Sequence, residues 1–316
     1  MPLDPRAKRF LDTLAAMNPP SALSLTAAAR REALAQLLGF AGPAEVVAAV
    51  HEQHIPGPAG PLALRSYTPA GASAAERLPG LIYLHGGGLV AGTLDTHDPI
   101  ARSLANASGW RVLSLGYRLG PEHPCPAAIE DACAASVWIA ANAAVLNLDA
   151  QRLGIAGDSA GATLAAVVAQ WSAATARVRF ALQFLLCPIM DFAAESESRR
   201  TLADGYLVDR ATLQHDLKHY LGAGADAADP RVSPLRAADL HGLPPALVHT
   251  AEFDPLRDEG RAYASRLEAA GVRTLYRCHP GMIHLFYGMR GLIPYAGVAF
   301  RLMGDDIREL LIAAQP

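Results

Sequence analysis

One serine of this chain is enclosed by glycine and alanine where a predicted strand meets a predicted helix. Residues 153–168 read LGIAGDSAGATLAAVV, so Ser159 lies between a short apolar run and a helical pattern of small residues. A serine on such a sharp turn projects its hydroxyl above the sheet, and the positions two before and two after it must be small to avoid collision. The pattern predicts a nucleophile at Ser159. The alternative is that Gly157 and Gly161 only permit tight packing of the strand and the helix.

The rest of the chain alternates short apolar runs with helical patterns, which is typical of βαβ units and a parallel sheet. Strands are expected within residues 78–88, 110–120, 153–157, 180–188, 244–252 and 273–280. Helices are expected over residues 126–144, 160–171, 256–271 and about 296–313. The predicted fold class is therefore α/β, with a mostly parallel sheet and helices on both of its faces.

Two segments interrupt this alternation. Residues 1–50 carry two amphipathic helical patterns, and residues 189–241 are polar, helical and rich in loops, with no predicted strand. Long insertions of this kind in a compact domain are usually lids or binding loops. The predicted division is a catalytic domain formed by residues 51–188 and 242–316, and a helical cap formed by residues 1–50 and 189–241.

Composition argues against several classes of protein. Of the 316 residues 51% are hydrophobic, but no stretch of about 18 strongly apolar residues could span a bilayer. The net charge of −3 provides no strongly basic surface for nucleic acid or anionic lipid. The four cysteines form no CxxC pair, so neither a zinc site nor a disulfide framework is expected. The N-terminal residues lack the pattern of a signal peptide, which predicts a cytoplasmic location.

A glycine-rich stretch, His85-Gly86-Gly87-Gly88, ends the first of the predicted buried strands. Consecutive glycines let the backbone turn its N–H groups toward a substrate, where they stabilise negative charge that develops on oxygen. The start of the helix after Ser159 offers a further free N–H group, that of Ala160. A flexible turn is the plainer interpretation, and it fits less well directly after a buried strand.

A serine hydroxyl needs a base to take its proton and an acid to hold that base. Asp254 and His284 follow the predicted strands 244–252 and 273–280, which places the three residues in the order Ser, Asp, His. Asp254 could instead cap the next helix, and Asp258 and Glu252 are other carboxylates within reach, so the position of the acid stays open here. We favour His284 over His279 because it is predicted to lie in a loop beyond the strand end.

Beyond HGGG and GDSAG, four further stretches share one resemblance: YRLGPEHPCPAAIEDA (117–132), DPRVSPL (229–235), LPPALVHTAEFDPLRDEG (243–260) and AGVRTLYRCHPGMIHLF (270–286). With them the chain resembles the hormone-sensitive-lipase-like carboxylesterases of bacteria. The resemblance implies an α/β-hydrolase core under a helical cap, which hydrolyses short- to medium-chain carboxylic esters without a cofactor or metal.

The resemblance also implies roles for particular residues. Ser159 would be the nucleophile, His284 the base and then the acid, and Asp254 rather than Asp258 the orienting carboxylate. The oxyanion donors would be the N–H groups of Gly87, Gly88 and Ala160. Several positions depart from the usual pattern: Gly116 replaces an aspartate, and Ala162 and Thr163 replace Gly-Asn after GDSAG. Leu89 stands where an aromatic residue commonly follows HGGG, and Leu285 stands where glycine is frequent. Leu89 and Leu285 are predicted to shape the substrate pocket.

Other interpretations remain open at this point. The same residues could hydrolyse an amide, a carbamate or a lactone, or the chain could be a ligand receptor similar to the plant gibberellin receptors; the presence of His284 argues against a receptor. The expected partner is a small-molecule ester, and the resemblance is compatible with a homodimer. His215 and His219 have metal-ligand spacing in HDLKH, but the glutamate of HExxH is missing, so a solvated cap helix is predicted there instead.

Overall fold

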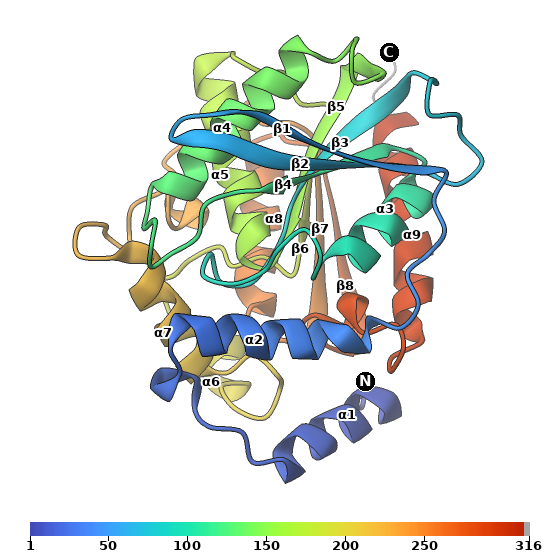
Figure 1. The fold of residues 1–316 in the computed structure, drawn as a ribbon. Helices are drawn as coiled ribbons and strands as arrows, with labels where there is room; N and C mark the ends of the chain where they lie inside the picture. Colours follow the sequence, from blue (N-terminus) through green and yellow to red (C-terminus); the bar gives the residue numbers. More distant parts are fainter. Residues whose placement is uncertain (313–316) are drawn as a thin grey trace.

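A single sheet crosses the computed structural model, which describes residues 1–312 (Figure 1). Its strands are β1 (Ala49–Gly57), β2 (Gly60–Thr68), β3 (Leu78–Leu84), β4 (Arg111–Gly116), β5 (Leu148–Asp158), β6 (Leu182–Leu186), β7 (Ala246–Phe253) and β8 (Thr274–Ile283). Their order is β1-β2-β4-β3-β5-β6-β7-β8. The pairs β1–β2 and β2–β4 are antiparallel and the other five are parallel. The predicted α/β class with a mostly parallel sheet is confirmed.

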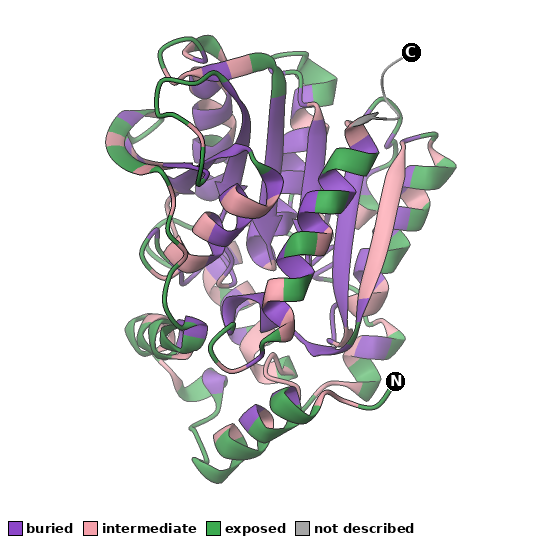
Figure 2. Cartoon of the chain, turned by 90° about the vertical axis from the view of Figure 1, so that its right-hand side faces the viewer, coloured by how far each residue is buried: buried purple, intermediate pink, exposed green. Residues whose placement is uncertain are grey.

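Helices cover both faces of this sheet. One face carries α3 (Asp98–Ser108) and α9 (Tyr295–Ile312), and the other carries α4 (Ala127–Ala141), α5 (Ala160–Thr175) and α8 (Arg257–Ala269). The strands in the middle of the sheet are buried on both sides (Figure 2). This burial explains why their sequences read as continuous apolar runs. Position 313 of the predicted last helix lies outside the described residues.

The hairpin of β1 and β2, together with α3, was not predicted. β1 lies at the edge of the sheet, and in its sequence AVHEQHIPG only Ile55 is buried. A strand that is mostly exposed has no long apolar run, so its sequence carries little of the signal that marked the central strands.

Three helices in the segments 1–50 and 189–241 begin at a residue whose side chain accepts hydrogen bonds from the first turn of the helix. Asp4 accepts hydrogen bonds from the N–H groups of Arg6 and Ala7 at the start of α1 (Pro5–Ala16). Thr26 does the same for α2 (Ala27–Leu38), and Asp209 for α7 (Arg210–Leu221). Such caps satisfy N–H groups that have no partner within the helix.

The helices α1, α2, α7 and the short α6 (Glu197–Thr201) lie together at one end of the molecule (Figure 1). The division into core and cap remains a prediction, and two details bear on its boundaries. β1 begins at Ala49, within the range 1–50. Val232, Ala237 and Leu240 pack in the apolar cluster that contains α5 and α8, although they fall within 189–241.

Two absences hold for the described part of the chain. No helix within residues 1–312 is both long enough and apolar enough to cross a membrane. The four cysteines are free thiols; Cys187 is buried and the other three are half-buried.

Candidate active site

Ser159 occupies the turn between β5 and α5 with φ 53° and ψ −124°, a backbone conformation that residues with a side chain rarely adopt. Its N–H donates to the carbonyl oxygen of Leu186, 2.8 Å away. A methyl group at Gly157 would overlap the backbone of Gly161, and one at Gly161 would overlap the carbonyl oxygens of Leu84 and His85. The expectation that these positions must be small is confirmed, because backbone atoms fill the space of a side chain.

Three predicted residues meet in a hydrogen-bonded row. His284 Nε2 lies 3.1 Å from Ser159 Oγ, and His284 Nδ1 lies 2.8 Å from Asp254 Oδ2. The carboxylate has no proton to donate, so Nδ1 donates to it and Nε2 is left as the acceptor that faces the serine hydroxyl. Asp254 and His284 are buried, while the serine is partly exposed. The arrangement can therefore take a proton from Ser159 and stabilise the resulting imidazolium.

Asp254 performs both of the roles that the sequence left open for it. Its Oδ1 accepts a hydrogen bond of 2.8 Å from the N–H of Leu256 at the start of α8, while Oδ2 faces His284. The other two carboxylates are engaged elsewhere: Asp258 accepts from the N–H of Ser198, and Glu252 accepts from the N–H of Gly281, both at 2.7 Å.

His284 lies in a turn beyond the end of β8, as predicted, but the strand ends three residues later than the expected position 280. β8 continues to Ile283, so His284 directly follows the strand and His279 lies inside it. The pairing of β7 with β8 shifts register between Ala251 and Phe253 and resumes at Phe253 and Ile283. Gly281 has φ +73° within this irregular stretch. A proline and a glycine usually end a strand, but here they mark a bulge after which the strand continues.

The pKa of His284 lies above its ordinary value of 6.5. Burial lowers it, but the charge and the hydrogen bond of Asp254 outweigh that effect. His284 accepts a proton only when it is neutral, so kcat/KM is expected to fall as the pH drops through a pKa above 6.5. Asp254→Asn removes the charge that raises the pKa of His284, so the fall of kcat/KM at acid pH (the acid limb of the profile) should move to lower pH. Activity should also fall by about 10⁴-fold.

Profiles of kcat/KM against pH check this expectation. Glu252→Gln is the matched control, because this carboxylate faces Gly281 and the N-terminal amine rather than His284; its acid limb should stay where the wild-type limb is. A wild-type limb below 6.5, or an unmoved limb in Asp254→Asn, would contradict the assignment.

The glycine loop between β3 and α3 is fixed to the turn that carries Ser159. Gly87 and Gly88 have φ of 117° and 69°, which glycine adopts without strain. In the described chain, no hydrogen bond uses the N–H groups of Gly87, Gly88 or Ala160. These three predicted donors are thus available to an oxyanion.

Asp158, which sequence reasoning did not single out, holds this loop. Its buried carboxylate accepts from the N–H of Gly86 at 2.9 Å and from the hydroxyl of Tyr83 at 2.5 Å, and His97 Nε2 lies 3.7 Å away. Burial raises the pKa of Asp158, but His97 and Tyr83 more than offset this and lower it. The signal available in the sequence was an acidic residue within a motif otherwise made of small residues.

His85 supports the same loop. Its ring stacks on Tyr117 with centroids 4.4 Å apart, and its Nδ1 lies 2.9 Å from the carbonyl oxygen of Gly86. Burial, reinforced by His97, lowers the pKa of His85 to about 4. The ring is therefore neutral near pH 7, and it contacts the loop backbone rather than Ser159.

Comparison with known proteins agrees with this geometry. Residues 81–288 match a family of proteins with the alpha/beta hydrolase fold. The chain belongs to the alpha/beta hydrolase family. The carboxylic ester hydrolase LipN of Mycobacterium tuberculosis is 43% identical over 76% of this chain and 65% of LipN. The ethyl acetate hydrolase of Pseudomonas putida is 38% identical over 79% of each chain.

Solved structures extend the comparison to nearly the whole chain. The hyperthermophilic esterase of Pyrobaculum calidifontis is 36% identical and superimposes with a TM-score of 0.91, covering 98% of this chain and 99% of the esterase. The resemblance to hormone-sensitive-lipase-like carboxylesterases is confirmed.

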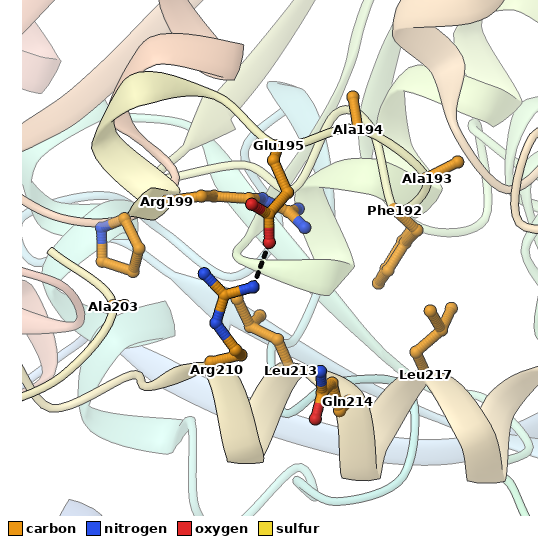
Figure 3. Close-up of a pocket in the computed structure, with 11 residues that line it drawn as sticks. Phe192, Ala193, Ala194, Glu195, Arg199, Ala203, Arg210, Leu213, Gln214 and Leu217 are labelled. Carbon is orange, nitrogen blue, oxygen red and sulfur yellow. Dashed lines mark hydrogen bonds and ion pairs between the residues drawn. The ribbon is translucent and has the colours of Figure 1, made fainter. Parts of the chain in front are cut away.

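In this alpha/beta hydrolase a cavity of about 300 Å³ lies between α7 and the segment after β6 (Figure 3). Phe192, Leu213 and Leu217 contribute apolar side chains, and Glu195 and Arg210 form an ion pair across it. Pro255, the residue after Asp254, is part of the wall.

The two predicted pocket residues, Leu89 and Leu285, do not line this cavity. Both are buried and have φ of 60°; Leu89 follows the glycine loop and Leu285 follows His284. Their part in the substrate pocket stays a prediction.

The prediction of a solvated helix at His215 was wrong. His215 is buried, with Nδ1 3.0 Å from Asp216 Oδ1 and Nε2 3.1 Å from the carbonyl oxygen of Leu25. His219 donates from Nδ1 to the carbonyl oxygen of His215. Cys187, Asp254 and His284 have atoms that could bind a metal ion, and these atoms lie within 4.8 Å of one another. Asp254 and His284 are already hydrogen-bonded to each other.

Proposed function

We propose that this chain is a serine carboxylesterase that hydrolyses short- to medium-chain carboxylic esters through an acyl-enzyme. The observation that carries the proposal is the row from Ser159 through His284 to Asp254, with free N–H groups at Gly87, Gly88 and Ala160 beside it. Relatives that are named as ester hydrolases and esterases support the substrate class.

In the proposed reaction, His284 Nε2 takes the proton of Ser159 while Oγ attacks the carbonyl carbon of the ester. The N–H groups of Gly87, Gly88 and Ala160 bind the anionic oxygen of the tetrahedral intermediate. The intermediate collapses, the C–O bond to the alcohol breaks, and His284 gives its proton to the leaving oxygen. Water, deprotonated by His284, then attacks the acyl-enzyme, and the acid leaves as Ser159 recovers its proton.

The cavity beside α7 suggests where the larger part of a substrate binds. A volume of about 300 Å³ is at the small end for a ligand site, and its apolar wall suits an alkyl chain. We expect kcat/KM of the purified full chain to be highest for butyrate to octanoate esters of p-nitrophenol and to fall for palmitate. The anilide of the preferred acid should react far more slowly than its ester. A preference for the anilide would favour an amide hydrolase.

Leu217→Trp tests whether the cavity is used. The larger side chain fills the space, so kcat/KM for octanoate should fall about tenfold more than kcat/KM for acetate. Lys218→Trp is the matched control, because Lys218 is the next residue of α7 and is exposed. Equal losses for both esters in Leu217→Trp would show that the substrate binds elsewhere.

Two further expectations remain predictions. A cytoplasmic location is based on the N-terminal sequence, and a homodimer on resemblance. Fractionation of the host cells and light scattering of the purified protein would test them.

A further inference from the structure

The glycine loop contacts two helices that lie far from it in the sequence. Leu34 of α2 packs against Gly87, so that a methyl group there would come within 2.9 Å of Leu34 Cδ2. The carboxylate of Asp216 on α7 packs against Gly88, where a methyl group would overlap it. Side chains of α2 and α7 therefore pack against Gly87 and Gly88, whose N–H groups are proposed oxyanion donors.

An ion pair joins these two helices at the loop. Arg30 of α2 donates to Asp216 from Nε at 3.1 Å and from Nη2 at 2.8 Å, which is the two-pronged geometry that fixes both side chains. The side chains of Arg30 and Asp216 are 13% and 6% exposed, so water screens the pair little. His215 supplies a further contact to Asp216 and ties α7 to the carbonyl oxygen of Leu25.

The neighbouring arginine of α2 binds the far end of the same loop. Arg31 Nε donates to the carbonyl oxygen of Val90 at 2.8 Å, and its Nη2 donates to the carbonyl oxygen of Gly120 at 3.0 Å. Through Arg30, Arg31 and Leu34, one helix therefore contacts the stretch from Gly87 to Val90 directly or by way of Asp216.

The contact between Asp216 and Gly88 places a negative charge beside the proposed oxyanion site. A buried carboxylate against Gly88 lies close to the place where the proposed reaction develops negative charge, and like charges in a poorly screened site repel. Arg30 neutralises that carboxylate. We propose that Arg30 and Asp216 are positioning residues of the oxyanion site, in which Arg30 holds α7 on Gly88 and cancels the charge of Asp216. The inference rests on the proposed esterase function.

Arg30→Gln should lower kcat for p-nitrophenyl butyrate by about tenfold or more with little change in KM, since the removal of one oxyanion donor costs about 10² to 10³. It should weaken inhibition by hexyl trifluoromethyl ketone by a similar factor, because this ketone forms an anionic adduct with serine. Arg30→Lys keeps the charge and should retain most of the ketone affinity. Adding Asp216→Asn to Arg30→Gln removes the repelling charge and should restore much of kcat and of the ketone affinity.

Arg277→Gln is the matched control. It breaks another arginine pair with a buried carboxylate, that of Asp306, which contacts Arg277 and His249 rather than the glycine loop. It should lower Tm and leave the ketone affinity unchanged. The inference is overturned if Arg30→Gln lowers Tm but keeps the wild-type ketone affinity, or if the double variant is no better than Arg30→Gln. If the wild type neither hydrolyses the ester nor binds the ketone, the proposed function fails instead.

Discussion

Replacement of Ser159 by alanine is expected to remove ester hydrolysis, with kcat falling by a factor on the order of 10⁴ or more. The proposed reaction runs through the Oγ atom, which lies 3.1 Å from His284 Nε2. Without that atom, the imidazole and the free N–H groups have no nucleophile to activate. Because Ser159 is partly exposed and alanine is smaller, the fold should tolerate the change.

Steady-state assays with p-nitrophenyl butyrate measure this effect, and mass mapping after treatment with an organophosphate locates the nucleophile. The wild type should be labelled at Ser159, and the variant should not be labelled there. Ser136→Ala is the matched control: this serine is buried in α4, where its Oγ donates to the carbonyl oxygen of Ala132 at 2.7 Å. Substantial turnover by a folded Ser159→Ala variant would refute the assignment.

Gly161→Ala is expected to damage stability and activity together. The added methyl group would lie less than 3.0 Å from the carbonyl oxygens of Leu84 and His85, which are backbone atoms and cannot rotate away. Overpacking of this kind costs about 1–3 kcal/mol and sometimes more. The collision also pushes α5 and the glycine loop apart, and a shift of about 1 Å at a reacting centre can cost about 10²-fold in rate.

Unfolding in urea and the kcat at a temperature where the protein is folded separate the two effects. Gly39→Ala is the matched control, because Gly39 has φ −59° and nothing within 4 Å of the added methyl group. Its stability and kcat should stay close to the wild-type values. A Gly161→Ala variant as stable and as active as wild type would show that the space around the elbow is less tightly filled than the structure indicates.

Much of the fold was predictable because the central strands are buried on both faces. Such strands have unbroken apolar sequences, and the turns after them carry glycine, serine or acidic residues. β1 escaped prediction because it is an exposed edge strand and lacks that pattern. β2 pairs on both sides, but its buried residues are interrupted by half-buried ones, so it has no unbroken apolar run. The end of β8 was misplaced because Gly281, a residue typical of turns, lies in a bulge that the neighbouring strand β7 stabilises by resuming its pairing at Ile283.

In the candidate site, too, the features marked by a short stretch of sequence were predictable, and those that depend on distant residues were not. The strand–Ser159–helix turn and the glycine loop were predictable because each is marked by small residues within one short stretch of sequence. The sequence left the carboxylate open between Asp254, Asp258 and Glu252 until resemblance favoured the first. Their hydrogen-bond partners distinguish them in space, because Asp254 faces His284, whereas Asp258 accepts from Ser198 and Glu252 from Gly281.

By itself the sequence determined the class of sheet, the strained turn at Ser159 and the order of the residues in the row, since these depend on short stretches of chain. Only the tertiary structure decided that Asp158 holds the glycine loop and that Arg30 meets Asp216, 186 residues further along, against Gly88. Such contacts depend on the path of the whole chain, and the energy that specifies that path is spread over the packing of the entire core.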